Sequence, residues 1–255
     1  MADIPMYRGI FFDISGVLYT GREAIPGAQS AIKSAQASDL EVRFVTNTSR
    51  RTRNQLVVDL KALGFDIDPD TLYTAPTAAH DWLERNKLRP YCLIHRDILS
   101  EFADLDQSQP NAVLIGDAAE TFRYQTLDRA FQLCMGGAPL VGVGCNRYFL
   151  LDNQLHLDAG PFIKAIEYAA STEAVILGKP SKDFFEQVVA STTLEASSIL
   201  MVGDDVHGDV EGALMSGLAG CLVKTGKFQP GDDKRITGAF SCVETVSEAV
   251  ALALS

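Results

Sequence analysis

Long apolar runs are absent from this chain of 255 residues. No stretch approaches the roughly 18 consecutive apolar residues that a membrane-spanning helix needs. The first residues, Met1 to Pro5, also lack the basic flank and apolar run of a secretory signal peptide. We therefore expect a soluble cytoplasmic protein that has no membrane partner.

Cysteine and positive charge are both scarce. The chain has five cysteines and no CxxC pair, which argues against a disulfide framework and against a thiolate metal site. Asp and Glu number 33 against 22 Lys and Arg, a formal net charge of −11. This balance argues against binding nucleic acid through a basic surface. It does not exclude phosphorylated small molecules, because one site can be locally positive or can use a metal.

Strand-like and helix-like patterns alternate along the whole chain, which predicts an α/β fold. Strands of an outer module are expected at 8–12, 41–45, 72–74, 174–177, 198–202 and 219–223, with helices at 26–37, 50–63, 181–191, 208–216 and 245–253. A second series of strands and helices, with a hairpin turning at Asp152-Asn153, lies between them. We predict a core from residues 1–76 and 173–255, with residues 77–172 inserted as a separate α/β domain.

Four short motifs place polar residues at the ends of predicted strands or in a tight loop. Residues 9–18 read GIFFDISGVL, and residues 44–48 read FVTNT. Residues 178–180 read GKP, and residues 201–205 read MVGDD, with Asp209 four positions further on. Ligands of open parallel sheets bind at the carboxyl ends of the strands. Taken alone, Asp13, Thr46 and Asn47 are more typical of a turn or a helix cap than of a site.

The side chains of these motifs suit phosphoryl transfer, which needs an in-line nucleophile and positive charge around the phosphoryl oxygens. Asp13 can act as a carboxylate nucleophile. The adjacent Asp204 and Asp205 repel one another unless a cation neutralises them, and Mg²⁺ is the expected cation. Thr46 and Asn47 can hydrogen-bond a phosphate. Lys179 can neutralise both the nucleophile and the phosphoryl group.

Taken in order, the four motifs resemble those of the haloacid dehalogenase (HAD) superfamily of phosphoryl-transfer enzymes, along the whole chain. The resemblance implies a Rossmann-like parallel-sheet core with an inserted α/β cap of type II, in its IIA form. It implies Mg²⁺ bound by the Asp13 side chain, the Ser15 carbonyl and Asp204, with Asp205 and Asp209 in support. The sequences DISGVLY at 13–19, GKPS at 178–181 and VKTGKF at 223–228 resemble the branch of phospholysine phosphohistidine inorganic pyrophosphate phosphatases and related HAD-domain proteins.

Ser15 departs from the superfamily pattern, which usually has a second Asp at this position as the general acid and base. Loss of a positioned acid–base group typically costs about 10²–10⁴ in rate. The loss matters least for leaving groups that depart without external protonation. We therefore predict a phosphatase that acts through an aspartyl-phosphate on P–N bonds, pyrophosphate or activated esters. The alternative is a catalytically weak phosphatase-like protein that binds a phosphorylated ligand or partner.

The inserted domain is expected to select the small phosphorylated substrate. Its polar and aromatic clusters are the candidates for this role: Arg123, Tyr124, Asn146, Arg147 and Tyr148. Taken alone, these residues are more typical of a solvated surface with aromatic packing. The resemblance also favours a homodimer formed through the cap.

Overall fold

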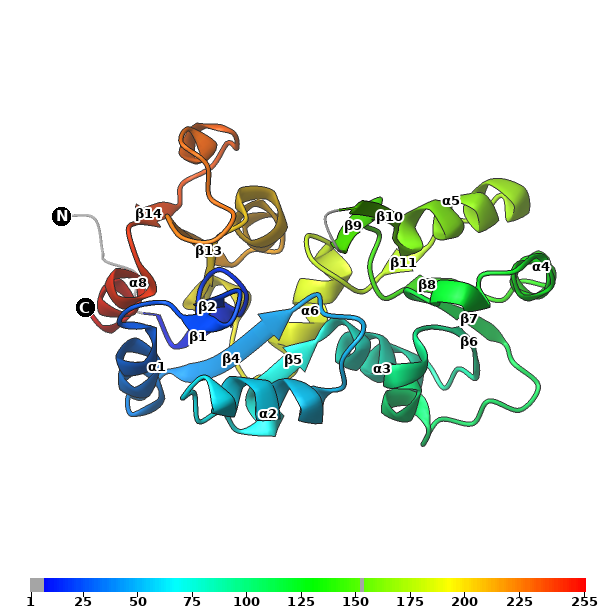
Figure 1. Ribbon diagram of the computed structural model, residues 1–255, viewed down its shortest axis with the longest axis horizontal. Coiled ribbons are helices and arrows are strands. Elements are labelled where there is room, and N and C mark those ends of the chain that lie inside the picture. Colours follow the sequence, from blue (N-terminus) through cyan, green and yellow to red (C-terminus); the bar gives the residue numbers. More distant parts are fainter. Residues whose placement is uncertain (1–6, 152–153) are drawn as a thin grey trace. The chain divides into compact units, whose positions relative to one another are not determined.

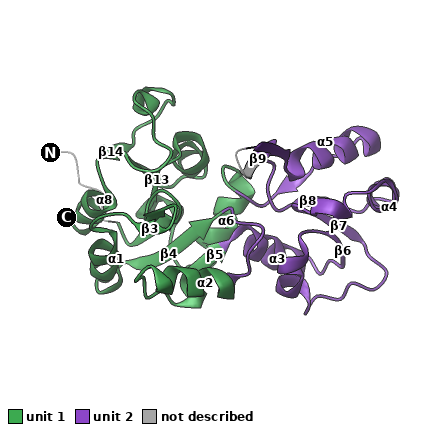
Figure 2. Ribbon diagram, in the orientation of Figure 1, with its two compact units in different colours: residues 1–46, 54–73, 179–255 green, residues 47–53, 74–178 purple. Residues whose placement is uncertain are grey.

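The computed structural model describes residues 7–151 and 154–255. The N-terminal segment inspected for a signal peptide, and the hairpin turn predicted at Asp152-Asn153, lie outside them. The chain divides into two compact units (Figure 2): residues 1–46, 54–73 and 179–255 make the first, and residues 47–53 and 74–178 the second. Within the described ranges, no helix is both long and apolar enough to cross a membrane.

A six-stranded sheet lies at the centre of the first unit, in the order β14-β13-β12-β1-β4-β5 (Figure 1). The strands are β1 (Gly9–Asp13), β4 (Glu41–Thr46), β5 (Leu72–Thr74), β12 (Ile199–Gly203), β13 (Ala219–Val223) and β14 (Ser241–Val243). The strand pairs from β14 to β4 are parallel. Every residue of β1 and β12 is buried, which explains their unbroken apolar runs, because both faces of the sheet are covered.

Helices and short turns surround this sheet. They are α1 (Ala28–Gln36), α2 (Arg53–Ala62), α6 (Lys182–Ala190), a π-helix (Val206–Glu211), α7 (Gly212–Met215) and α8 (Val246–Leu254), with a small hairpin of β2 (Tyr19–Thr20) and β3 (Glu23–Ala24). Side chains of α1, α2 and α8 share one apolar cluster with alternate residues of β1, including Ile10 and Phe12. Leu222 of β13 joins a different cluster with Val210, as the two-residue period of a strand requires.

The second unit contains its own parallel sheet, in the order β11-β8-β7-β6. Its strands are β6 (Pro90–Leu93), β7 (Ala112–Ile115), β8 (Leu140–Gly142) and β11 (Val175–Ile176), and a separate hairpin is formed by β9 (Tyr148–Leu151) and β10 (Gln154–Leu157). Its α-helices are α3 (Ala75–Arg85), α4 (Tyr124–Met135) and α5 (Ala159–Ala170), and a 3-10 helix covers Arg96–Phe102. The apolar residues of α4 and α5 pack with those of β7 and β8 in one cluster, which includes Ala130, Ile163 and Val113.

Two local predictions differ from the structure. The helix predicted over 208–216 is instead the π-helix followed by the single turn of α7. The π-helix begins early because the Asp205 carboxylate accepts hydrogen bonds from the backbone N–H groups of His207 and Gly208, at 3.1 and 2.8 Å. The sequence also did not predict β14, whose three residues are only partly buried and show no strong apolar pattern.

Candidate functional site

Three aspartates converge at the carboxyl ends of two central strands of the first unit. Asp13 is the last residue of β1, and Asp204 follows β12 directly. Because these strands pair in parallel with Phe12 opposite Val202, their ends reach the same edge of the sheet. Asp209, on the π-helix, completes the group, and one carboxylate oxygen from each residue lies within 4.8 Å of the others. We call Asp13, Asp204 and Asp209 the carboxylate cluster.

Lys179 joins two members of the carboxylate cluster. Its Nζ lies 2.5 Å from Asp13 Oδ1 and 2.7 Å from Asp209 Oδ1, and only 6 % of its side chain is exposed. Burial by itself would lower the pKa of Lys179, but the two carboxylates outweigh it and raise that pKa above its usual value. The lysine is therefore a fixed positive charge beside the Asp13 carboxylate.

Burial dominates the electrostatics of the three aspartates. It raises the pKa of Asp13 above its usual value, although Lys179 opposes the shift. Burial also raises the pKa of Asp204 to about 6, where the Lys227 backbone hydrogen bond opposes it. The pKa of Asp209 is likewise raised to about 6, by burial against the opposing charge of Lys179. Three buried carboxylates with one ammonium group thus form an anion-rich site.

Asp204 provides the test of whether a metal suits this cluster. Its Oδ2 accepts a hydrogen bond of 2.6 Å from the backbone N–H of Lys227. Within the described part of the chain, its Oδ1 is buried and has no hydrogen-bond partner. A buried, unpartnered carboxylate oxygen is costly unless a cation meets it. The donor set consists of hard oxygens, which suits Mg²⁺, so the residues present fit the ion that the sequence predicts.

Asp205 lies outside the carboxylate cluster, although its neighbour Asp204 belongs to it. Its Oδ1 caps the π-helix, and its Oδ2 lies 3.3 Å from Nζ of Lys227. Its backbone N–H donates to Asp209 Oδ2 at 3.1 Å, so Asp205 orients Asp209. Asp209 lies within the carboxylate cluster, and Asp205 lies beside it. The supporting roles expected for both residues stay predictions.

Three further predicted site residues lie at or just after the ends of β4 and β1 along the chain. Thr46 ends β4, one position beyond the residue that pairs with Asp13, and is buried. Asn47 follows Thr46 and belongs to the second unit. Its side chain approaches the backbone of Gly178, because a Cβ added to that glycine would lie 3.3 Å from Asn47 Oδ1. Ser15 is exposed in the turn after Asp13 and forms an isolated bridge with Tyr19. The phosphate-binding and carbonyl-ligand roles of these residues stay predictions.

The predicted substrate-selecting residues all belong to the second unit. Arg123 precedes α4, and its Nε donates to the Glu120 carbonyl oxygen at 3.0 Å. Tyr124 opens α4 and is 78 % exposed. Asn146 and Arg147 are exposed in the connection that leads to Tyr148 at the start of β9. Their role in substrate selection stays a prediction.

Two polar groups have contacts that the sequence did not predict, and the first lies within the motif VKTGKF at 223–228. Thr225, Gly226 and Lys227 follow β13 and contact the Asp204 region, and the rule applied to the other strand ends would have found them. In the second unit, Arg50 donates to the Asp117 carboxylate and lies 4.3 Å above the ring of Phe149. These three residues are far apart in the sequence, so no local sequence pattern indicates that they contact one another.

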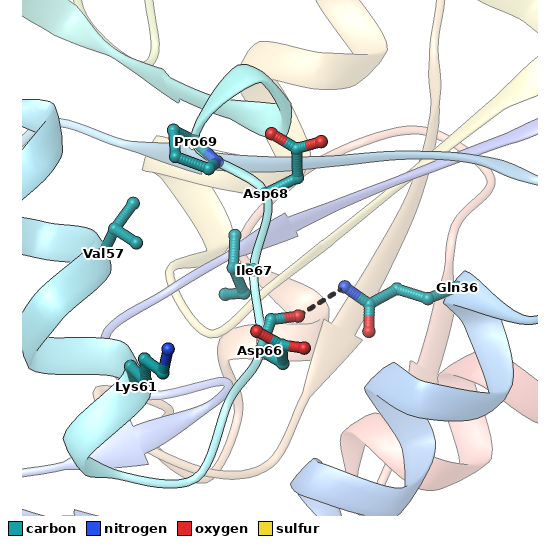
Figure 3. A pocket seen from close by; sticks show the side chains of 7 residues that line it. All are labelled: Gln36, Val57, Lys61, Asp66, Ile67, Asp68 and Pro69. Carbon is teal, nitrogen blue, oxygen red and sulfur yellow. Dashed lines mark hydrogen bonds between the residues drawn. The ribbon is translucent and has the colours of Figure 1, made fainter.

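A pocket of about 520 Å³ lies elsewhere in the first unit, beside α1, α2 and the chain that leads to β5 (Figure 3). It is lined by Gln36, Val57, Lys61, Asp66, Ile67, Asp68 and Pro69. The Gln36 side chain bridges one wall by donating to the Asp66 carbonyl oxygen at 3.0 Å. None of these residues belongs to the carboxylate cluster, so chemistry and not cavity size identifies the candidate site.

Comparison with known proteins places the chain in a family. Residues 10–108 match the family model of haloacid dehalogenase-like hydrolases, and residues 176–249 match a second model described as HAD-hydrolase-like. The bovine haloacid dehalogenase-like hydrolase domain-containing protein 2 is 41 % identical over 239 residues, which cover 94 % of this chain and 92 % of the relative. Human phospholysine phosphohistidine inorganic pyrophosphate phosphatase is 42 % identical over 254 residues, covering 97 % and 94 %.

Solved structures agree on the fold. The p-nitrophenyl phosphatase of Archaeoglobus fulgidus aligns with a TM-score of 0.86 and 21 % identity, covering 97 % of this chain and 99 % of that one. NagD of Escherichia coli aligns with a TM-score of 0.85 and 20 % identity, covering 95 % and 98 %. The chain therefore belongs to the haloacid dehalogenase-like hydrolases and is a hydrolase of their phosphatase group. The predicted α/β fold, with a parallel core sheet and a second α/β unit of the type II cap, is confirmed.

Proposed function

We propose that this protein is a Mg²⁺-dependent phosphohydrolase that forms an aspartyl-phosphate on Asp13. The observation that carries the proposal is the buried carboxylate cluster. Lys179 pairs with Asp13, and Asp204 has an oxygen without a hydrogen-bond partner among the described residues. A carboxylate beside a fixed cation, at a sheet edge that suits a hard metal, matches the needs of phosphoryl transfer. The membership of the chain in a hydrolase family supports it.

In the proposed reaction, an Asp13 carboxylate oxygen attacks phosphorus while the bond from phosphorus to the leaving group breaks. Lys179 balances charge on Asp13 and on the phosphoryl oxygens, and Thr46 and Asn47 hydrogen-bond the phosphate. Mg²⁺, held by Asp13, Asp204 and the Ser15 carbonyl, would supply further positive charge to the phosphoryl oxygens. Water then hydrolyses the aspartyl-phosphate, which releases inorganic phosphate and restores the carboxylate.

Ser15 sets the proposed substrate class. Its hydroxyl cannot replace a carboxyl group as acid and base, so leaving groups that need no enzyme proton are favoured. Phosphoramidates, pyrophosphate and activated aryl esters belong to this class. The name of the human relative mentions phospholysine, phosphohistidine and pyrophosphate. These compounds contain P–N or pyrophosphate bonds, so the name supports the proposed substrate class.

The second unit is proposed to act as the cap, over residues 77–172, and to select the substrate through Arg123, Tyr124, Asn146, Arg147 and Tyr148. A homodimer formed through this cap and a cytoplasmic location complete the proposal. Gel filtration with light scattering measures the oligomeric state directly. A monomer at micromolar concentration would contradict the dimer without touching the proposed chemistry.

The test is turnover of p-nitrophenyl phosphate, imidodiphosphate, pyrophosphate and a panel of sugar phosphates, with Mg²⁺, then with EDTA, then with Mg²⁺ restored. We expect turnover of the first three with Mg²⁺, loss with EDTA and recovery on restoration. The second candidate is a catalytically weak phosphatase-like protein that binds a phosphorylated ligand or partner. Ser15 favours it, because a hydroxyl group stands where a carboxyl group would act as acid and base. Binding of pyrophosphate without turnover of any substrate would support that candidate and contradict the hydrolase.

A further inference from the structure

The loop that follows β13 contacts the carboxylate cluster from a part of the chain that none of the four motifs includes (orange in Figure 1). Its residues Thr225, Gly226 and Lys227 all lie in the first unit, as does Asp204. Three separate contacts connect this loop with Asp204 and with the turn after β1. Together they hold the Asp204 carboxylate in one orientation.

The first contact is a backbone hydrogen bond. The N–H of Lys227 donates to Asp204 Oδ2 at 2.6 Å. This bond occupies one carboxylate oxygen and leaves the other, Oδ1, as the buried atom without a hydrogen-bond partner among the described residues. A carboxylate that could rotate freely would present either oxygen. The bond to Oδ2 therefore selects which oxygen remains available to a cation.

The second contact ties the loop to the turn after β1. The Thr225 hydroxyl donates to the Gly16 carbonyl oxygen at 2.5 Å. Gly16 comes three residues after Asp13, so this bond connects the loop with the strand end that carries the proposed nucleophile. It also accounts for a threonine at this position, because the bond needs a hydroxyl group.

The third contact is the close approach of Gly226. A Cβ at this position would overlap both Asp204 Oδ2 and the Cα of Gly16, so only glycine lets the loop pack this closely. Its φ of +58° also favours glycine. By contrast, Gly21 has a similar φ of +63° but open space around a Cβ. The two glycines therefore separate the effect of backbone conformation from the effect of crowding.

We propose that Thr225, Gly226 and the backbone N–H of Lys227 form a positioning clamp that aims Asp204 Oδ1 at the metal. The clamp rests on the proposed function only in taking Mg²⁺ as the cation.

The ammonium group of the Lys227 side chain does not belong to the clamp. That group lies 3.3 Å from Asp205 and repels a divalent cation, so its removal is not expected to weaken Mg²⁺ binding.

The test is calorimetric titration of Mg²⁺ into the metal-free full-length chain. Gly226→Ala and Thr225→Val should weaken Mg²⁺ binding by about tenfold or more, the usual cost of losing a group that orients a metal ligand. Thr225→Ser, which keeps the hydroxyl, and Gly21→Ala, which strains the backbone without a clash, should stay within about threefold of the parent chain. Lys227→Met, which keeps the backbone N–H, should bind Mg²⁺ at least as tightly as the parent.

The outcomes separate the clamp from the proposed function. Parent-like affinity in both Gly226→Ala and Thr225→Val overturns the clamp, even if the enzyme turns over its substrates. If Gly226→Ala fails to fold, as judged by circular dichroism, Thr225→Val against Thr225→Ser decides alone. A chain that binds Mg²⁺ with the expected order of affinities but hydrolyses no substrate supports the clamp and contradicts the hydrolase. Weaker binding in Lys227→Met than in Gly226→Ala overturns the clamp, because the ammonium would then be the group that matters.

Discussion

Lys179 Nζ lies 2.5 Å from Asp13 Oδ1, although 166 positions of sequence separate the two residues. The pair is almost fully buried, with 6 % and 10 % of the two side chains exposed. Asp209 shares the same ammonium at 2.7 Å. The Lys179 ammonium group therefore pairs with both the proposed nucleophile and Asp209. Replacing Lys179 with an uncharged residue would remove both ion pairs at once.

Replacing Lys179 by Met should abolish turnover and also destabilise the fold. Breaking a buried ion pair by removing one partner typically costs about 3–5 kcal/mol. Urea unfolding monitored by circular dichroism measures this loss. Lys182→Met is the matched control, because Lys182 is 64 % exposed and pairs with Glu186 on its own helix. Equal stability of the two variants would show that the Lys179 pair contributes little.

Asp204→Asn should reduce both activity and the response to Mg²⁺. The change removes the charge from a hard oxygen ligand while keeping the size of the side chain. The measurement is the p-nitrophenyl phosphate rate as a function of Mg²⁺ concentration, with Asp233→Asn, an exposed acidic residue of the same unit, as the control. An unchanged Mg²⁺ dependence in Asp204→Asn would remove this residue from the metal site. Ca²⁺ should inhibit the parent enzyme, because it is larger and prefers looser geometry.

His80 in the second unit should make stability depend on pH. Hydrogen bonding to Asp81 raises its pKa from 6.5 to about 9, burial opposes the shift, and Asp104 adds to it at 3.0 Å. The charged form is favoured in the folded state, so this stabilisation is complete below pH 6.5 and is lost as the pH rises through about 9. Its size should be about 1 kcal/mol, because Asp104 is 66 % exposed.

The stability difference between the parent chain and His80→Gln checks this expectation. We expect the difference to be largest near pH 6 and to shrink toward about pH 10. His207→Gln serves as the control, since His207 is half exposed and pairs with Glu211 on its own helix. A His80→Gln difference that is constant over this range, or grows with pH, would contradict the assignment.

The sequence predicted the central strands and the polar residues at their ends because these features are local. The apolar runs before Asp13 and Asp204 identify buried parallel strands, and the order of the motifs places both residues at one sheet edge. The sharing of Lys179 by Asp13 and Asp209 depends instead on the path of the π-helix, which turns Asp209 into the cluster. No local pattern encodes that path.

The contact of the loop at residues 225–227 with Asp204 was not predicted, for a related reason. The motif VKTGKF at 223–228 was noted for its family resemblance, but its hydrogen bond to Asp204 comes from a backbone N–H, which every residue except proline carries. Side-chain chemistry therefore did not indicate that the loop contacts Asp204. The grouping of Arg50 with Asp117 and Phe149 likewise depends on tertiary packing within the second unit. Local patterns thus located the proposed reacting groups better than the groups that orient them.

Ser15→Asp tests the proposed substrate class. If Ser15 restricts the enzyme to easy leaving groups, the parent rate should fall steeply as the leaving-group pKa rises. The variant restores a carboxyl group and should flatten that dependence by speeding alkyl phosphate hydrolysis, toward the lower part of the range of about 10²–10⁴. Rates for aryl and alkyl phosphates of graded leaving-group pKa, at saturating Mg²⁺, provide the slopes. Equal slopes in a folded, metal-bound variant would move the cause of selectivity to the second unit.

The most direct test of the central claim is the turnover of p-nitrophenyl phosphate by Asp13→Asn. The substitution keeps the shape of the side chain but removes the nucleophilic charge, and folding is checked by circular dichroism. A covalent role predicts no measurable turnover in the variant. In the parent chain, it predicts a beryllium fluoride adduct at Asp13. Residual activity above about a tenth of the parent rate, well beyond what loss of a covalent nucleophile allows, would contradict the aspartyl-phosphate mechanism.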